Sequence, residues 1–170
     1  MPSNVEIKAR VRDMEAMHGA VEAAGARLRG EFVQEDVFFH APRGRLKLRV
    51  TASGAELIHY LREDSSGPTT SRYRLCPIAD PERLRETLGA ALGVRGIVRK
   101  RRTFFLVGQT RIHLDRVEGL GSFLELEVVL EPGQAPEEGR KIANGLMQRL
   151  GVGPNDLVAG AYIDLLERRA

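Results

Sequence analysis

The sequence has little of what disulfide-rich, membrane-spanning or base-stacking proteins need. It contains one cysteine, no tryptophan and 5% aromatic residues. A single cysteine excludes an internal disulfide framework, and so few aromatic rings argue against a platform for stacked nucleic-acid bases. No apolar run approaches the roughly 20 residues that cross a bilayer as a helix. The first residues lack the basic and apolar regions of a signal peptide. We therefore expect a cytoplasmic protein with no membrane partner.

The composition that remains is that of an ordinary globular domain. The chain has 170 residues, of which 42% are hydrophobic and 29% charged, with a formal net charge of +3. This length is enough to bury a core within one domain. No linker, low-complexity tract or repeat divides it, so we predict a single domain over residues 1–170. The small positive charge permits an anionic partner without requiring one.

Alternation of apolar and polar residues predicts eight strands, at 5–11, 36–40, 46–50, 56–62, 71–75, 97–107, 110–117 and 122–130. Helices are expected from Asp13 to about Leu28, Asp80 to Gly93, Pro136 to about Leu150, and about Asn155 to Arg168. An even, meandering set of strands can close on itself and remove its edges. We predict an α+β fold, an eight-stranded antiparallel β-barrel that forms a tunnel, with flanking helices. An open antiparallel sheet covered by helices on one face is the alternative.

Charged side chains recur at every second position of several strands, and residues of one parity share a face. These stripes are Glu6-Lys8-Arg10, Lys47-Arg49, Arg72-Arg74, Lys100-Arg102, Arg111-His113-Asp115 and Glu125-Glu127, with Tyr60 paired to Arg62. A solvated sheet face is the simple explanation. However, the alternate positions are apolar on nearly every strand, and acids fall mainly on the first and last two strands while bases dominate between them. This segregation favours an enclosed charged interior.

The acidic stripe predicts a metal site. Glu125 and Glu127 point the same way, roughly 6.5–7 Å apart along the strand, and such carboxylates repel unless a cation lies near them. With Glu6 and Asp115 they form an all-oxygen set, which Mg²⁺ or Mn²⁺ prefers. The alternative is that each acid pairs with an arginine opposite.

The basic stripes need an anionic partner, because burying unpaired charges together is very costly. The bases concerned are Lys8, Lys47, Arg49, Arg62, Lys100 and Arg102. A linear triphosphate suits bases that face inward from several strands. The run Arg99–Arg102 could be a nucleic-acid patch, but as a strand it alternates outward and inward, so nucleic acid is not the expected partner.

His113 stands between Arg111 and Asp115 on its predicted strand face. A lone histidine in such a position is more often part of a structural pairing than a catalytic group. We therefore expect His113 to be structural.

The order of these motifs resembles the CYTH superfamily, the triphosphate tunnel metalloenzymes, and in particular its class IV adenylate cyclase-like members. The family signature Glu-x-Glu-x-Lys corresponds to the stretch Asn4-Val5-Glu6-Ile7-Lys8. The segment 44–49 is similar to the family's third strand. The segments 99–102, 113–115, 119–121 and 123–127 resemble the second half of a cyclase-like member. The resemblance covers nearly the whole chain.

The resemblance implies roles for the charged residues. Glu6, Asp115, Glu125 and Glu127 would bind Mg²⁺ or Mn²⁺, and the six bases would hold the triphosphate of ATP, thiamine triphosphate or tripolyphosphate. Glu6, Lys8 and Glu127 would be the catalytic residues of an adenylate cyclase or a triphosphatase.

Two departures from the family pattern accompany the resemblance. Asn4 replaces the first signature glutamate and offers oxygen but no charge, which would weaken one metal site. Tyr60 and Arg62 do not reproduce a lysine often found on the fourth strand. A non-catalytic nucleotide- or polyphosphate-binding module is therefore the alternative function.

Overall fold

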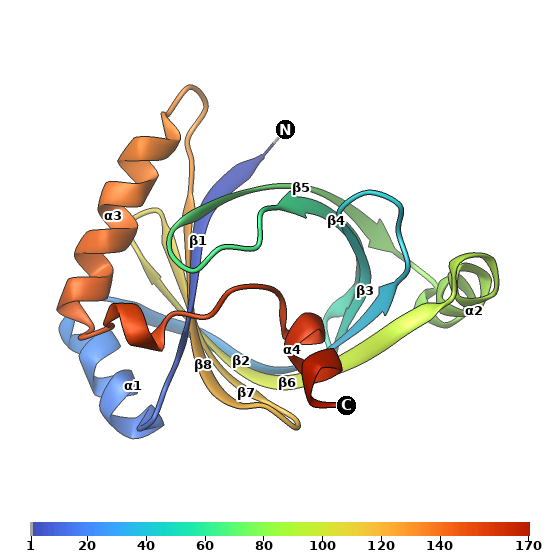
Figure 1. Ribbon diagram of the computed structural model, residues 1–170, viewed down its shortest axis with the longest axis horizontal. Helices are drawn as coiled ribbons and strands as arrows, with labels where there is room; N and C mark the ends of the chain where they lie inside the picture. Colours follow the sequence, from blue (N-terminus) through green and yellow to red (C-terminus); the bar gives the residue numbers. More distant parts are fainter. Residues whose placement is uncertain (1) are drawn as a thin grey trace.

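A computed structural model describes residues 2–170 and contains a closed barrel (Figure 1). Its strands are β1 (Ser3–Arg10), β2 (Arg27–Phe39), β3 (Arg45–Thr51), β4 (Gly54–Arg62), β5 (Thr69–Ile78), β6 (Val94–Val107), β7 (Thr110–Val117) and β8 (Gly121–Val129). The strand order around the barrel is β1-β5-β4-β3-β2-β6-β7-β8, and every neighbouring pair is antiparallel. The predicted eight-stranded antiparallel barrel is confirmed, and the open sheet is excluded.

The strand order differs from the simple meander expected from the sequence. Strands β2 to β5 form one meander and β6 to β8 form another. Strand β1 lies between β5 and β8, with Glu6 opposite Thr69 on one side and Glu127 on the other. Strand β2 pairs with β6 along most of its length. These three long-range pairings close the barrel, and the pairing of β1 with β8 brings Glu6 against Glu127.

Helices cover the apolar parts of the outer face of the barrel wall. Helices α1 (Met14–Ala23) and α3 (Pro136–Arg149) pack on one side, where Ile7, Leu124 and Leu146 belong to one buried cluster. Helix α2 (Pro81–Leu92) lies on the opposite side, where Leu84 packs against the cluster that contains Leu48. Figure 1 shows this arrangement. On β1, β3 and β8 the apolar parity is buried under these helices, and the charged parity faces the barrel interior.

Helix α4 (Tyr162–Arg169) packs against residues at one end of the barrel. Tyr162 is buried in a cluster with Phe38 of β2 and Phe123 of β8. Asp164 fixes the helix to the barrel through ion pairs with Arg45 at 2.7 Å and Arg95 at 2.6 Å. A helix thus covers one end of the tunnel.

The first helix is shorter than the sequence predicts. It ends at Ala23, not near Leu28, because Gly25 adopts a left-handed φ of 86° that breaks the helix. Strand β2 then begins at Arg27, so Leu28 lies in a strand and is 52% exposed.

The predicted extent of the last helix is also wrong. A short 3₁₀ turn (Pro154–Asp156) is followed by an extended segment before α4 begins at Tyr162. Leu157 forms a bridge with Ala9, and the amide of Val158 donates to the Lys8 carbonyl at 2.9 Å. Pairing with β1 replaces helical hydrogen bonding in this segment. Over residues 2–170, no helix has the length and apolar character to span a membrane.

Candidate active site

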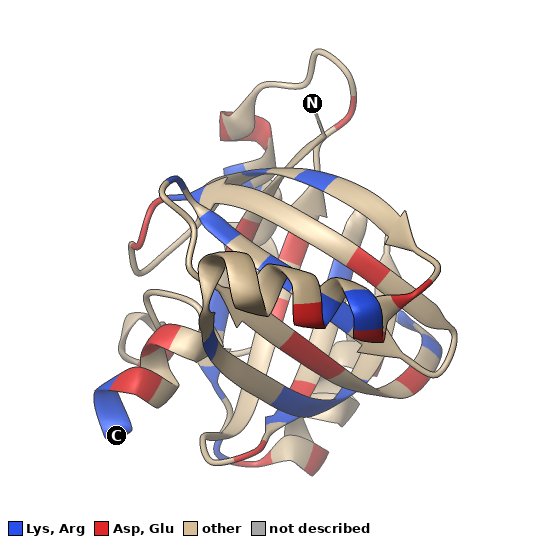
Figure 2. Cartoon of the chain, turned by 90° about the vertical axis from the view of Figure 1, so that its right-hand side faces the viewer, with Lys and Arg blue, Asp and Glu red and all other residues tan. Residues whose placement is uncertain are grey.

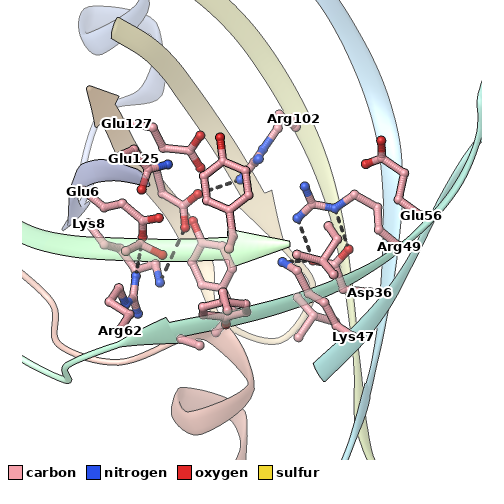
Figure 3. A pocket seen from close by; sticks show the side chains of 18 of the residues that line it. Glu6, Lys8, Asp36, Lys47, Arg49, Glu56, Arg62, Arg102, Glu125 and Glu127 are labelled. Carbon is pink, nitrogen blue, oxygen red and sulfur yellow. Dashed lines mark hydrogen bonds and ion pairs between the residues drawn. The ribbon is translucent and has the colours of Figure 1, made fainter. Parts of the chain in front are cut away.

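A cavity of about 170 Å³ lies inside the barrel, and all eight strands contribute to its lining. Seven lysine or arginine residues and five acidic residues face it. Figure 2 shows charged residues distributed along the strands, and Figure 3 shows the charged side chains converging from several strands. The volume is below the roughly 300–1,000 Å³ of ordinary small-molecule sites, because long paired side chains extend into the space. The excess of bases favours an anionic ligand.

The structure brings together nine of the ten site residues predicted from the sequence. These nine cavity-lining residues are Glu6, Lys8, Lys47, Arg49, Arg62, Lys100, Arg102, Glu125 and Glu127. Strand parity thus placed them on one enclosed surface. Asp115 is the exception.

Asp115 is fully buried and does not line the cavity. Arg102 donates to its two oxygens at 2.7 and 2.6 Å, and the Tyr162 hydroxyl donates to Oδ2 at 2.9 Å. Arg102 also donates to Glu125 at 2.7 Å. The structure therefore places Asp115 where its carboxylate orients Arg102, not on the wall beside the glutamates as expected for a metal ligand.

Three glutamates crowd one side of the cavity. Glu6 and Glu127 are direct cross-strand neighbours, and Glu125 is two residues before Glu127 on β8. Burial raises the pKa of Glu6, and repulsion by Glu127 and Glu125 raises it further, against the opposing effect of Arg62. Arg62 donates to Glu6 at 2.8 Å. A cation bound here would relieve the repulsion among the carboxylates.

A second acid, Asp36 on β2, anchors the basic side of the cavity and was missed by the sequence analysis. It is 2% exposed and accepts from Arg49 at 2.8 and 2.9 Å and from Lys47 at 2.9 Å. Burial alone would raise the pKa of Asp36, but Arg49 and Lys47 hold it well below its ordinary value. The signal that could have found Asp36 is its parity with Phe38, which also lines the cavity.

Two further charged residues of the lining were not predicted. Glu56 shares the parity of Arg62 on β4, and Arg111 lies opposite Glu127 on β7. By contrast, Arg72 and Arg74 are exposed on the outside of β5, since the opposite parity of that strand faces inward. Strand parity shows which residues share one face of a strand, but it does not by itself show which face points into the barrel.

The buried lysines carry an incompletely compensated charge. Burial lowers the pKa of Lys8 to about 8, although Glu125 partly offsets the effect. Burial and then Arg49 lower the pKa of Lys47 to about 7, in spite of Asp36. Burial also lowers the pKa of Lys100. A bound polyanion would favour the charged form of each amine.

The His113 side chain lies within ion-pair distance of two glutamates of β8. Its ring packs against Phe104 at 5.4 Å, and its Nδ1 makes no hydrogen bond within residues 2–170. That atom lies 3.8 Å from Glu125 Oε2 and 3.8 Å from Glu127 Oε1. Burial and then Arg102 lower the pKa of His113. One nitrogen and two carboxylate oxygens thus lie within 4.8 Å of one another, a donor set able to hold a metal ion.

The fold and the site together define a tunnel protein whose interior suits a polyanion and a divalent cation. The chain belongs to the CYTH domain family, whose family model matches residues 3–162.

Several known proteins are similar to this chain over most of its length. The chain is 28% identical to adenylate cyclase CyaB of Aeromonas hydrophila over 96% of its own length and 88% of that protein. The PH1012 protein from Pyrococcus horikoshii is 30% identical in sequence to this chain. Its structure matches with a TM-score of 0.87 over 95% of this chain and 98% of that one. HpAC1 from Hippeastrum, described with a dominant triphosphatase activity, has the same fold at 19% identity, with a TM-score of 0.61 over 88% of each chain.

Proposed function

We propose that this chain is a divalent-metal-dependent enzyme that acts on a triphosphate-bearing small molecule inside its barrel. The observation that carries the proposal is the convergence of seven bases and three crowded glutamates on one enclosed cavity. Cyclisation of ATP is the first reaction to test, because the chain is similar over nearly its full length to an adenylate cyclase.

The residues present fit a divalent ion. Glu6, Glu125 and Glu127 supply oxygen donors that repel one another without a cation. They would hold Mg²⁺ or Mn²⁺, while Asp115 positions Arg102. When bound, the ion neutralises charge on phosphate oxygens.

The basic wall would bind and orient the phosphate chain. Lys47 and Arg49 now share Asp36, and Arg62 is paired with Glu6. A polyphosphate offers these donors stronger, more highly charged acceptors, so the ion pairs exchange partners when it enters. The same role is proposed for Lys8, Lys100 and Arg102. Binding through several fixed donors holds the reacting phosphorus in one place.

A proton must leave the attacking hydroxyl. In cyclisation, the ribose 3′-oxygen forms a bond to the α-phosphorus, the bond from that phosphorus to pyrophosphate breaks, and the proton passes to a base. We assign this base to Glu6, a cavity-lining carboxylate that lies directly across from Glu127 on the neighbouring strand. Lys8 and Glu127, its neighbours on the cavity wall, complete the proposed catalytic group. α4 limits access of water from its end of the barrel.

The test is a product screen with ATP, thiamine triphosphate and tripolyphosphate, each with Mg²⁺ and with Mn²⁺. Phosphate, pyrophosphate and cyclic nucleotide are measured separately. Glu125→Gln is expected to lower the rate by about 100-fold or more, whereas Glu131→Gln, at an exposed position after β8, should retain it. Full activity in Glu125→Gln would contradict the proposed metal-carboxylate site.

Hydrolysis is the second candidate, because the same phosphate and metal site serves when water is the nucleophile. The fold alone does not exclude it, since HpAC1 combines this fold with a triphosphatase activity. Orthophosphate as the product selects hydrolysis, and cyclic AMP with pyrophosphate selects cyclisation. Tight triphosphate binding without turnover at any metal concentration would select a non-catalytic binding module instead.

A further inference from the structure

His113 is a buried polar side chain that the proposed chemistry does not use. It is 6% exposed, and its Nδ1 has no hydrogen-bond partner in the described chain, residues 2–170. A buried nitrogen without a partner costs free energy, on the order of 1–3 kcal/mol. Such an atom, beside the cavity-lining Glu125 and Glu127, calls for a ligand that accepts its lone pair or its proton.

The surroundings of Nδ1 favour a metal ion as that ligand. The nearest acidic oxygens, Glu125 Oε2 and Glu127 Oε1, are each 3.8 Å away, too far for hydrogen bonds. Ligands at roughly 2.0–2.2 Å from one ion are about 3.0–3.5 Å apart when adjacent. A small rotation of the two glutamate side chains would bring all three donors to one ion.

We infer that His113 Nδ1 binds the metal together with Glu125 and Glu127, and that this nitrogen makes the site prefer a first-row transition ion such as Mn²⁺ over Mg²⁺. The inference rests on the proposed function for the presence of a metal in this cavity. It adds a ligand of a different chemical type.

The donor set explains the expected preference. Mg²⁺ is a hard ion that favours oxygen ligands and water. Imidazole nitrogen raises affinity along the divalent transition series, in which Mn²⁺ comes first and Zn²⁺ and Co²⁺ bind more tightly. Lys8 and Arg102 also contact Glu125, at 3.5 and 2.7 Å, so the carboxylates alone are a weakened ligand pair. A neutral nitrogen donor strengthens the site without adding charge.

Pulsed electron paramagnetic resonance of Mn²⁺ tests the inference directly on the full chain. Spectra are recorded with Mn²⁺ alone and with Mn²⁺ plus tripolyphosphate. We expect a coupling from a directly bound ¹⁴N that changes to a ¹⁵N coupling when the protein is labelled with [¹⁵N]histidine. The label requires no substitution, so failure of a variant to fold cannot obscure the result.

Substitutions assign the nitrogen and measure the preference. His113→Gln should lose the coupling and lower Mn²⁺ affinity about 10- to 100-fold, with a much smaller change for Mg²⁺. His18→Gln, on the half-exposed face of α1, should keep both. Titration calorimetry with each metal gives the ratio of the Mn²⁺ affinity to the Mg²⁺ affinity.

The spectra separate failure of this inference from failure of the proposed function. Coupling to ³¹P of tripolyphosphate without histidine nitrogen would overturn the inference and leave the function standing. Histidine coupling without ³¹P would support the inference and count against the triphosphate site. Absence of Mn²⁺ binding in both samples would overturn the inference.

Discussion

Lys47 shows how burial changes the chemistry of one side chain in this barrel. Its pKa in the folded protein is about 7, lowered by burial and by Arg49. In the unfolded chain a lysine has a pKa of about 10.4. Between these values the unfolded state binds more protons, so stability must rise with pH over this window.

We therefore predict that the free energy of unfolding increases from pH 7 to pH 9, with Lys47 contributing up to about 1 kcal/mol per pH unit. Lys8, whose pKa is about 8, adds to the slope above pH 8. Urea unfolding at pH 7, 8 and 9 measures it. Lys47→Met should show a shallower slope, whereas Lys141→Met, exposed on α3, should keep the wild-type slope. Equal slopes in all three proteins would contradict the account.

Asp36 is predicted to stabilise the fold and to weaken the binding of anions in the cavity. Asp36→Asn leaves Lys47 and Arg49 buried without their shared carboxylate, which should destabilise the fold by about 3–5 kcal/mol. The same change should tighten tripolyphosphate binding, because the cavity becomes more positive.

The matched control for Asp36→Asn is Glu35→Gln on the outer face of the same strand. Glu35 pairs with Arg99 at 2.8 Å near the surface, and such pairs contribute about 0–1 kcal/mol. Chemical unfolding and calorimetry with tripolyphosphate compare the variants. Equal effects of the two substitutions would show that the buried cluster has no special role.

At the residue scale, strand alternation predicted the site best where inward charged residues have apolar neighbours on both sides. Lys47 lies between Leu46 and Leu48, and this contrast is visible in the sequence. Asp36 escaped because the stretch that follows it, Val37-Phe38-Phe39, is apolar on both faces. The position of Asp115 behind Arg102 depends on Tyr162 of α4, a contact between distant parts of the chain.

At the scale of elements, α3 is held to the barrel by close approach of its backbone. A Cβ added at Gly139 would lie 2.7 Å from Leu130 Cδ2 and 2.8 Å from Val5 Cγ2. Only glycine lets the helix approach β1 this closely. At Gly145, in the same helix, no described atom lies within 4 Å of an added Cβ.

The two glycines of α3 therefore predict opposite effects of one substitution. Gly139→Ala should destabilise the protein by about 1–3 kcal/mol through overpacking. Gly145→Ala should stabilise it by roughly 0.5–1 kcal/mol, since alanine is the better helix former. Thermal unfolding of both variants measures the difference. A shift of the same sign in both would contradict the proposed packing of α3.

Sequence periodicity located most elements but not their ends. Gly25 ends α1 earlier than predicted, and the segment after Asp156 forms β-type contacts with Ala9 and Lys8. The early end of α1 follows from a local glycine that periodicity does not take into account. The extended segment depends on β1, which lies far away in the sequence, so local periodicity could not predict it.

At the scale of the whole molecule, closure depends on β1 entering between β5 and β8. Alternation predicts that strands exist, but it carries no information about which strands pair across long separations. A ligand that joins the glutamates of β1 and β8 to the bases of β3 and β4 should stabilise the closed barrel as a unit.

We predict that tripolyphosphate with Mn²⁺, at about 100 times its Kd, raises stability by roughly 3 kcal/mol. For a chain of this length that corresponds to an increase in Tm on the order of 5–10 °C. Orthophosphate at the same concentration should give a much smaller shift, because it cannot reach both sides of the cavity. Equal shifts from the two anions would point to a general salt effect.

The central claim, that the charged faces of separate strands form one metal and triphosphate site, is tested most directly by anomalous diffraction from crystals grown with Mn²⁺ and tripolyphosphate. The account predicts a manganese peak inside the barrel beside Glu125 and Glu127, with phosphate density against Lys47 and Arg49. Manganese and phosphate bound only on the outer surface of the barrel would contradict it.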